Sequence, residues 1–267
     1  MRSSIHSRIE AKRVAITGAG GGLGRAMAIR FAEQGWKVAI ADINATAMQE
    51  CFDTVIGHSK DSFIQHCDVR QEADFEKLLT KCNERWGGVD VLVNNAGIAS
   101  INSIHKESID SWQRIVDINT LGAVRGCKVF VPALKKQGGG HIVNIASVAG
   151  ISCTPHMSSY NTTKAAVIAL SETLRWELKS ANIGVTVVCP SMFKTGLADS
   201  SGVENGKIKG NLEKMMAASK LSADDIAESI YTAVQKNTFM LLPHKSSRWL
   251  WWLKRLSPDL YQYYMSR

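Results

Sequence analysis

The 267-residue sequence has no apolar run close to the about 18 residues that a membrane-spanning helix needs. Residues 1–13 carry basic side chains but no apolar stretch of the kind that marks a secretory signal. We therefore expect a soluble, cytoplasmic protein.

Several catalytic and metal-binding motifs are also missing. There is no HExxH, no P-loop lysine and no GxSxG, so metalloprotease, phosphoryl-transfer and α/β-hydrolase chemistry have no anchor. The six cysteines form neither a Cys-x-x-Cys pair nor a Cys/His spacing typical of a zinc site. This pattern predicts a reduced compartment, no disulfide framework and no metal site.

The charge distribution argues against a nucleic-acid partner. Net charge is +8, but residues 1–13 hold four basic residues against one acidic, and residues 244–267 hold five against one. The body between them is nearly neutral, whereas a nucleic-acid groove needs Lys and Arg gathered on one folded face. We expect no nucleic-acid binding.

Short β-rich runs alternate with helical patterns through most of the chain. We predict strands at 13–17, 37–42, 63–68, 89–97, 141–147, 184–190 and 238–243, and helices at 22–34, 44–56, 71–86, 110–136, 160–178 and 222–236. The strands are continuous apolar runs, as expected when helices cover both faces of a parallel sheet. The predicted fold is a single-domain α/β Rossmann fold, with a seven-stranded, doubly wound parallel sheet and helices on both faces.

Two segments depart from this alternation. Residues 191–220 are polar and rich in glycine, which is typical of a lid-like insert or of a long surface loop. Residues 244–267 form a basic aromatic tail that follows the catalytic domain predicted for residues 1–243.

A glycine cluster joins the first strand to the first helix. Gly18, Gly22 and Gly24 let the backbone turn tightly and approach a pyrophosphate at the helix N-terminus. Asp42 ends the second strand, where an acid can accept hydrogen bonds from an adenosine ribose and repels a 2′-phosphate. This favours NAD(H) over NADP(H), although Asp42 alone could equally cap the helix at 44–56.

Tyr160 and Lys164 stand four residues apart on a predicted helix, so their side chains share one face. A phenol and an ammonium held together could be a proton donor and the charge that tunes its pKa. They could equally be a packing tyrosine and a lysine that extends to solvent.

The order of several motifs along the chain resembles that of a known family and favours the catalytic interpretation of Tyr160 and Lys164. The glycine loop "TGAGGGLG", Asp68-Val69, "NNAG" at 94–97 and the set Asn119, Ser147, Tyr160 and Lys164 resemble the short-chain dehydrogenase/reductase family. The resemblance covers about residues 12–243 and implies a catalytic tetrad of Asn119, Ser147, Tyr160 and Lys164. The cofactor-binding residues that it implies are Gly18, Gly22, Leu23, Gly24, Asp42, Asp68, Val69, Asn94, Ala96, Gly97, Tyr160, Lys164 and Thr195.

The implied activity is NAD(H)-dependent interconversion of an alcohol and a carbonyl. Tyr160 would be the general acid or base, with its pKa lowered by Lys164, while Ser147 holds the substrate oxygen. Asn119 would anchor a water chain behind Lys164. One departure is Pro190-Ser191, where the family usually has Pro-Gly. The alternative is a dinucleotide-sensing or scaffold protein that keeps the fold without turnover.

The C-terminal tail indicates the class of substrate, and the helix at 160–178 indicates the partner. Residues 246–267 hold three tryptophans and three tyrosines among basic residues, so this segment could lie in a bilayer interface. It could instead pack over the substrate cleft or onto a partner subunit. Either arrangement adds apolar surface near Met192, Phe193, Met215 and Met216, and we expect a lipophilic substrate: a retinoid, steroid or long-chain aldehyde. The family resemblance implies a homodimer or homotetramer through the helix at 160–178.

Overall fold

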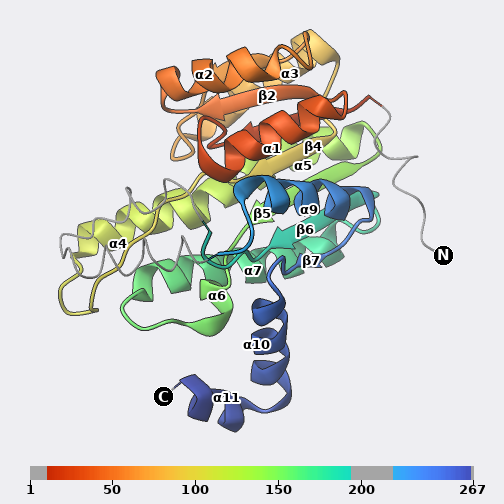
Figure 1. The fold of residues 1–267 in the computed structure, drawn as a ribbon. Coiled ribbons are helices and arrows are strands. Elements are labelled where there is room, and N and C mark those ends of the chain that lie inside the picture. Colours follow the sequence, from red (N-terminus) through yellow and green to blue (C-terminus); the bar gives the residue numbers. More distant parts are fainter. Residues whose placement is uncertain (1–10, 194–218, 266–267) are drawn as a thin grey trace.

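The computed structural model describes residues 11–193 and 219–265. Among them, seven parallel strands form one sheet in the order β3-β2-β1-β4-β5-β6-β7 (Figure 1). The strands are β1 (Arg13–Thr17), β2 (Lys37–Asp42), β3 (Phe63–His66), β4 (Val91–Asn94), β5 (Gly140–Ile145), β6 (Ile183–Val188) and β7 (Met240–Leu241). This confirms the predicted Rossmann-type α/β architecture.

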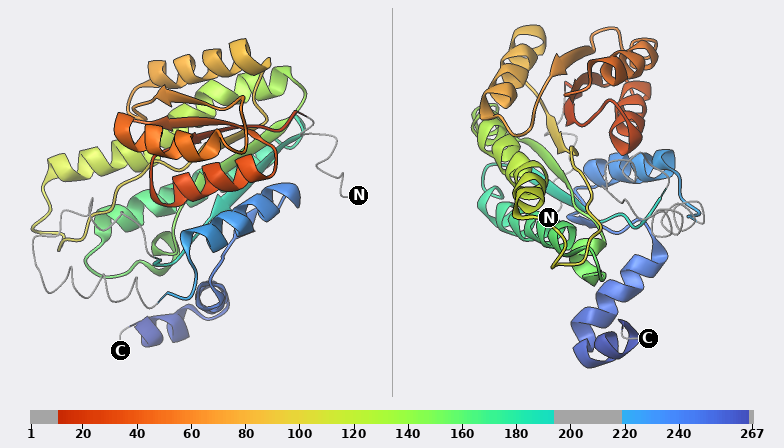
Figure 2. Two further views of the ribbon diagram at one scale, coloured as in Figure 1. Left: turned by 45° about the horizontal axis from the view of Figure 1, so that its top comes forward. Right: turned by 90° about the vertical axis from the view of Figure 1, so that its left-hand side faces the viewer.

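Helices cover both faces of the sheet (Figure 2). One face carries α1 (Gly22–Glu33), α2 (Ala45–Val55) and α9 (Ala223–Gln235), and the other carries α3 (Glu72–Trp86), α5 (Gly122–Lys136) and α7 (Ser158–Glu177). All residues of β4, β5 and β6 are buried, as continuous apolar strands between two helical layers should be. On α1 the buried stripe includes Leu23, Met27 and Phe31.

Chain order reverses between β1 and β4, which are neighbours in the sheet although β2 and β3 come between them in sequence. In an open parallel sheet this reversal leaves a crevice at the carboxyl ends of the two strands, where ligands bind. The glycine cluster that follows β1 and the segment that follows β4 therefore meet at one place.

The helix predicted at 110–136 is interrupted. It consists of α4 (Ile109–Val116), a π-helical turn η2 (Asp117–Leu121) and α5. The π-turn contains Asn119, whose side chain bonds to backbone outside the helix. Such turns are common at functional sites because they reposition single side chains.

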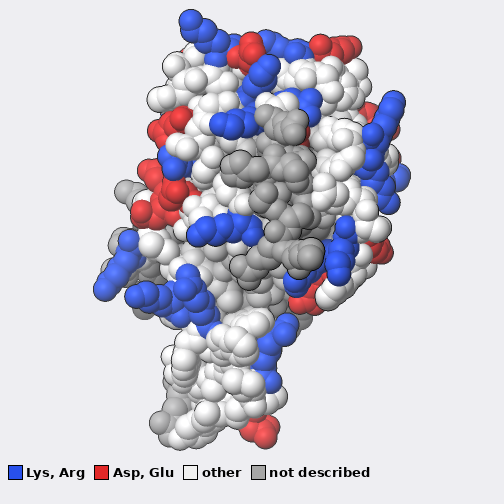
Figure 3. Space-filling view, turned by 90° about the vertical axis from the view of Figure 1, so that its right-hand side faces the viewer, with Lys and Arg blue, Asp and Glu red and all other residues white. Residues whose placement is uncertain are grey.

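The last strand and the tail also differ from expectation. The strand predicted at 238–243 is only two residues long in β7. The tail forms two helices, α10 (Lys245–Leu256) and α11 (Pro258–Met265), that project from the body (Figures 1 and 3). In the described part of the chain, no helix combines the length and the apolar character needed to cross a bilayer.

Candidate active site

The turn between β1 and α1 has the shape of a phosphate cradle. Gly18 and Gly22 have φ values of +63° and +51°, which favour glycine. A Cβ on Gly24 would collide with the carbonyl oxygen of Gly18. The first turn of α1 has no acidic residue and no side-chain cap, so its backbone N–H groups are available to an anion. The residues present therefore fit a dinucleotide pyrophosphate.

Asp42 lies beside this turn, at the end of β2. Its Oδ2 accepts from Gly20 N at 2.9 Å and its Oδ1 accepts from Asn44 N at 3.1 Å. Asn44, rather than Asp42, caps α2 by accepting from Ala47 N. The capping role considered for Asp42 thus belongs to Asn44, and the carboxylate is placed at the cradle, where it could meet a ribose.

The segment after β4 braces the same turn. Asn95 Nδ2 donates to the carbonyl oxygens of Thr17 at 2.9 Å and Gly18 at 3.0 Å. In return, Thr17 Oγ1 accepts from the backbone N–H groups of Asn95 and Ala96. The turn therefore keeps its shape through contacts between two distant segments.

The neighbouring Asn94 faces another way. Its Nδ2 donates to Asn144 Oδ1 at 2.9 Å inside the sheet, and its Oδ1 lies against Gly126 of α5. The expected cofactor contacts include Asn94 but not Asn95 or Thr17, although both of these lie in the motifs that carry the resemblance. Alternation of side chains between the two faces of a strand is the signal that could have separated the two asparagines.

Ser147, Tyr160 and Lys164 come together next to this crevice. Ser147 follows β5, and Tyr160 and Lys164 lie one turn apart on α7, with all three buried. Ser147 Oγ donates to Pro190 O at 3.4 Å and accepts from Ala149 N at 3.1 Å, and the Ser147 side chain acts to lower the pKa of the Tyr160 phenol. Lys164 Nζ donates to Ile145 O at 2.9 Å and lies 5.6 Å from the centre of the Tyr160 ring. The hydroxyl, the phenol and the ammonium are thus neighbours in one buried group.

Asn119 connects the π-turn to the segment after β4. Its Oδ1 accepts from Ile98 N at 2.8 Å, and its Nδ2 donates to Ile98 O at 2.9 Å. The same Nδ2 reaches Thr163 Oγ1 on α7 at 3.2 Å. A Cβ on Gly97 would sit 3.1 Å from Asn119 Oδ1 and 3.4 Å from Lys164 Nζ. All four predicted tetrad residues are therefore brought into one neighbourhood.

The pKa of Tyr160 is raised, whereas a lowered value was expected from the neighbouring Lys164. Burial raises the pKa of Tyr160 to about 12, and the Ser147 side chain opposes this only in part. Burial also lowers the pKa of Lys164 to about 8, because the ammonium is withdrawn from water. Desolvation, which a helical spacing does not reveal, is the largest cause of both shifts.

The remaining expected cofactor contacts are Asp68, Val69 and Thr195. Arg70 donates from Nε to Asp68 Oδ1 and from Nη2 to Asp68 Oδ2, and this pairing holds the pKa of that carboxyl below its usual value. Val69 is buried against Gly122. Thr195 and most of the expected insert, together with Met215 and Met216, lie outside the described residues.

Ser191, which stands where the family usually has glycine, forms a hydrogen bond to the start of the C-terminal tail. Its backbone N–H donates to His244 Nδ1 at 3.2 Å, just before α10. This bond joins the chain after β6 to the base of the C-terminal helices. Sequence analysis gave no role to His244.

Glu107 is another residue that the sequence did not indicate. Its buried Oε1 accepts from the hydroxyls of Ser100 at 2.5 Å, Ser159 at 2.7 Å and Ser111 at 3.1 Å. These serines come from the segment after β4, from α7 and from α4. Ser159 precedes Tyr160, so the carboxylate fixes the start of the catalytic helix. No sequence motif marks it, because the three donors are assembled only by the fold.

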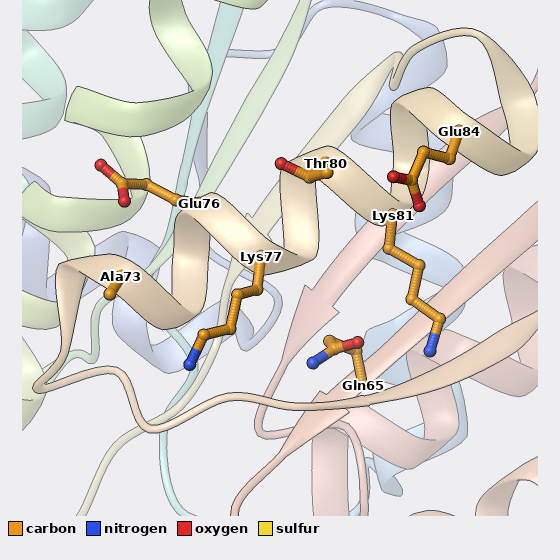
Figure 4. Close-up of a pocket in the computed structure, with 7 residues that line it drawn as sticks. All are labelled: Gln65, Ala73, Glu76, Lys77, Thr80, Lys81 and Glu84. Carbon is orange, nitrogen blue, oxygen red and sulfur yellow. The ribbon is translucent and has the colours of Figure 1, made fainter.

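A shallow depression of ≈ 510 Å³ lies elsewhere, on α3 and the edge strand β3 (Figure 4). Polar and charged side chains such as Gln65, Lys77 and Glu84 line it. Neither element carries a member of the tetrad, and the depression has no connection to the catalytic group.

The sequence is similar to known dehydrogenases over most of its length. The family model for short chain dehydrogenase matches residues 12–206. Identity to "Probable oxidoreductase EphD" of Mycobacterium tuberculosis is 32% over 232 residues, which is 84% of this chain and 39% of the relative. The chain thus spans less than half the length of that protein.

Solved structures resemble it more completely. A short chain dehydrogenase/reductase from Burkholderia phymatum in complex with NAD gives a TM-score of 0.87 at 30% identity, covering 95% of this chain and 96% of that one. The 3-ketoacyl-(acyl-carrier-protein) reductase from Brucella melitensis complexed with NADH gives 0.78 at 27% identity, covering 88% and 97%.

Because Lys164 has a pKa of about 8 in the folded protein against an ordinary 10.5, its proton is lost on folding between these values. The unfolded chain then binds more protons, so the Lys164 contribution to stability rises with pH across this window. We expect the free energy of unfolding of the wild type, minus that of Lys164→Met, to increase by about 2 kcal/mol from pH 7 to 9.5. Urea unfolding of both proteins at pH 7 and at pH 9.5 measures this difference in the free energy of unfolding. Buried cysteines and Tyr160 titrate in both proteins and cancel in the difference; a difference that does not change with pH would contradict the burial argument.

Proposed function

Because the chain belongs to the short-chain dehydrogenase/reductase family, we propose that it interconverts a lipophilic alcohol and its carbonyl with NAD(H). Membership makes it an oxidoreductase that acts on CH–OH donors. The observation that carries the proposal is the buried group of Ser147, Tyr160 and Lys164 beside the glycine cradle.

Protonation states support the reductive direction. With a pKa of about 12, Tyr160 keeps its proton at neutral pH and is available to donate it to a carbonyl oxygen. Ser147 hydrogen-bonds the same oxygen and holds it against the phenol. The Lys164 ammonium lies near the ring and stabilises the phenolate as it forms. A bound nicotinamide would supply the hydride. In the oxidative direction Tyr160 would have to lose its proton before it could take up the proton of the alcohol.

The preference for NAD(H) rests on the Asp42 carboxylate. It lies beside the cradle, where it can accept from ribose hydroxyls and repel an added phosphate. The two similar structures described above were solved with NAD and NADH, which supports the same preference for this chain.

An apolar wall next to Tyr160 supports a lipophilic substrate. Tyr160 packs with Ala99, Ala149 and Met157, and Ile98 and Ile101 lie against this cluster. Met192 and Phe193 follow Pro190, whose carbonyl oxygen accepts from Ser147. A substrate whose oxygen lies at Ser147 would therefore place its neighbouring carbon atoms against apolar side chains of the protein. The hydrocarbon part of a retinoid, a steroid or a long-chain aldehyde suits this environment.

The substrate proposal is tested with a panel of carbonyls. Retinal, a ketosteroid and a long-chain aldehyde are compared with sugars and other polar carbonyls, with NADH and NADPH supplied separately and their absorbance followed. We expect kcat/KM to be higher for the lipophilic set and for NADH. Faster turnover of the polar set would overturn the lipophilic assignment, and faster turnover with NADPH would overturn the role of Asp42.

Catalysis is distinguished from dinucleotide sensing by Tyr160→Phe. We expect this variant to bind NADH like the wild type and to lose about 10²-fold or more in kcat, because the proton donor is removed. Tyr261→Phe is the matched control, since Tyr261 is also buried but bonds to Ser152 O outside the catalytic group. It should retain turnover. Wild-type-like turnover by Tyr160→Phe would contradict the assignment, and a wild type without turnover on any substrate would favour the sensor.

A further inference from the structure

We propose that the C-terminal hairpin, α10 and α11, docks the protein on the surface of an anionic phospholipid bilayer. The hairpin projects from the body, and in Figure 3 its surface is mostly uncharged. Six large apolar or aromatic side chains on it are each more than half exposed: Trp249, Trp252, Leu256, Leu260, Tyr263 and Tyr264. This is an unusual concentration of such residues on one exposed element.

The two helices present these side chains as one surface. On α10 the exposed residues follow helical spacing, and those of α11 do the same. The rings of Trp249 and Tyr264 meet edge to face at 5.1 Å and join the helices. Between the helices lies an apolar hollow of ≈ 580 Å³. Its lining residues are Trp249, Leu253, Leu260, Tyr263, Tyr264 and Met265.

The opposite side of the hairpin is fixed to the body. Tyr261 Oη donates to Ser152 O, and Lys254 Nζ donates to Ile151 O. Arg255 pairs with Glu172 of α7 at 3.6 Å, and Trp251 packs on the apolar cluster beneath. Because these contacts use one side, the exposed apolar surface points outward in a defined orientation.

The chemistry of the hairpin matches a bilayer interface. Trp and Tyr prefer the headgroup level, where the ring is apolar and its polar atom stays wet. The described residues of the two helices include four basic residues, Lys245, Arg248, Lys254 and Arg255, against the single acid Asp259. Lys254 and Arg255 contact the body, so Lys245 and Arg248, near the start of α10, are the basic residues that can attract anionic lipid. In a symmetric contact between two copies, the same basic residues would approach each other with few acids to pair them.

The position of the hairpin also suggests how a lipophilic substrate reaches the active site, an inference that rests on the proposed function. Ile151 and Ser152 of α6 (Ala149–Ser152), to which the hairpin is bonded, come shortly after Ser147. Lipid would therefore lie beside the segment that holds the substrate oxygen. A substrate dissolved in the bilayer would reach the site without crossing bulk water.

Vesicle sedimentation of the full-length protein tests the docking surface. Vesicles contain phosphatidylcholine with or without phosphatidylserine, and the double variant Trp252→Gln/Leu256→Gln is compared with the wild type. A matched control is Trp176→Gln/Ile104→Gln, which removes a tryptophan and an aliphatic residue, each more than half exposed, from other surfaces. We expect the wild type and the control to bind vesicles with phosphatidylserine, more weakly in high salt, and the hairpin variant to bind at least tenfold less.

Equal binding of all three proteins, or no binding by the wild type, would overturn the proposal. Sedimentation velocity without lipid gives the other outcome: self-association lost only in the hairpin variant would assign this surface to a second copy and likewise overturn it. Turnover of a short water-soluble carbonyl is measured in parallel and should be unchanged in both variants. Absence of turnover in every protein, with the lipophilic carbonyls of the panel as well as the short one, would refute the proposed function while leaving the vesicle result intact.

Discussion

Removal of the Tyr160 phenol and the Lys164 ammonium from water is the constraint on which the catalytic group depends. An ammonium in a buried position is destabilising unless polar groups compensate, and here the Ile145 carbonyl does so in part. The same burial keeps the phenol protonated, so the site holds a neutral acid beside a cation that is ready to stabilise its conjugate base. Both groups owe their protonation states to position rather than to each other.

That position is produced by segments far apart in sequence. Reversal of chain order between β1 and β4 brings the glycine turn next to the chain after β4, and Asn95 and Thr17 join the two. Asn119 then connects this chain to α7 through Ile98 and Thr163. The cofactor cradle and the proton donor are therefore held in one frame by side-chain hydrogen bonds. The same α7 pairs with the C-terminal hairpin through Glu172 and Arg255, so the proposed membrane surface is fixed relative to the acid.

Patterning in the sequence predicts the alternation of strands and helices and the seven-stranded sheet, because burial of a parallel strand on both faces requires a continuous apolar run. Motifs also predict which four residues gather at the site. The π-turn at Asn119 was not predictable, since its cause is a bond to Ile98 in another segment. Direction of the Tyr160 pKa shift was missed because spacing along a helix does not report desolvation. Glu107 and its three serines, and the choice of Trp251 rather than Trp252 to face the body, likewise depend on tertiary packing. Assembly through α7 stays a prediction.

The central claim is that burial sets the protonation of the catalytic pair, and its most direct test is the pKa of Lys164 itself. Carbon-13 NMR of protein labelled at the lysine side chains, with Lys164→Met used to assign the Lys164 signal, follows this group from pH 6 to 11. The account predicts a midpoint near pH 8. A midpoint at the ordinary value near 10.5 would show that the ammonium is solvated, and would contradict the claim.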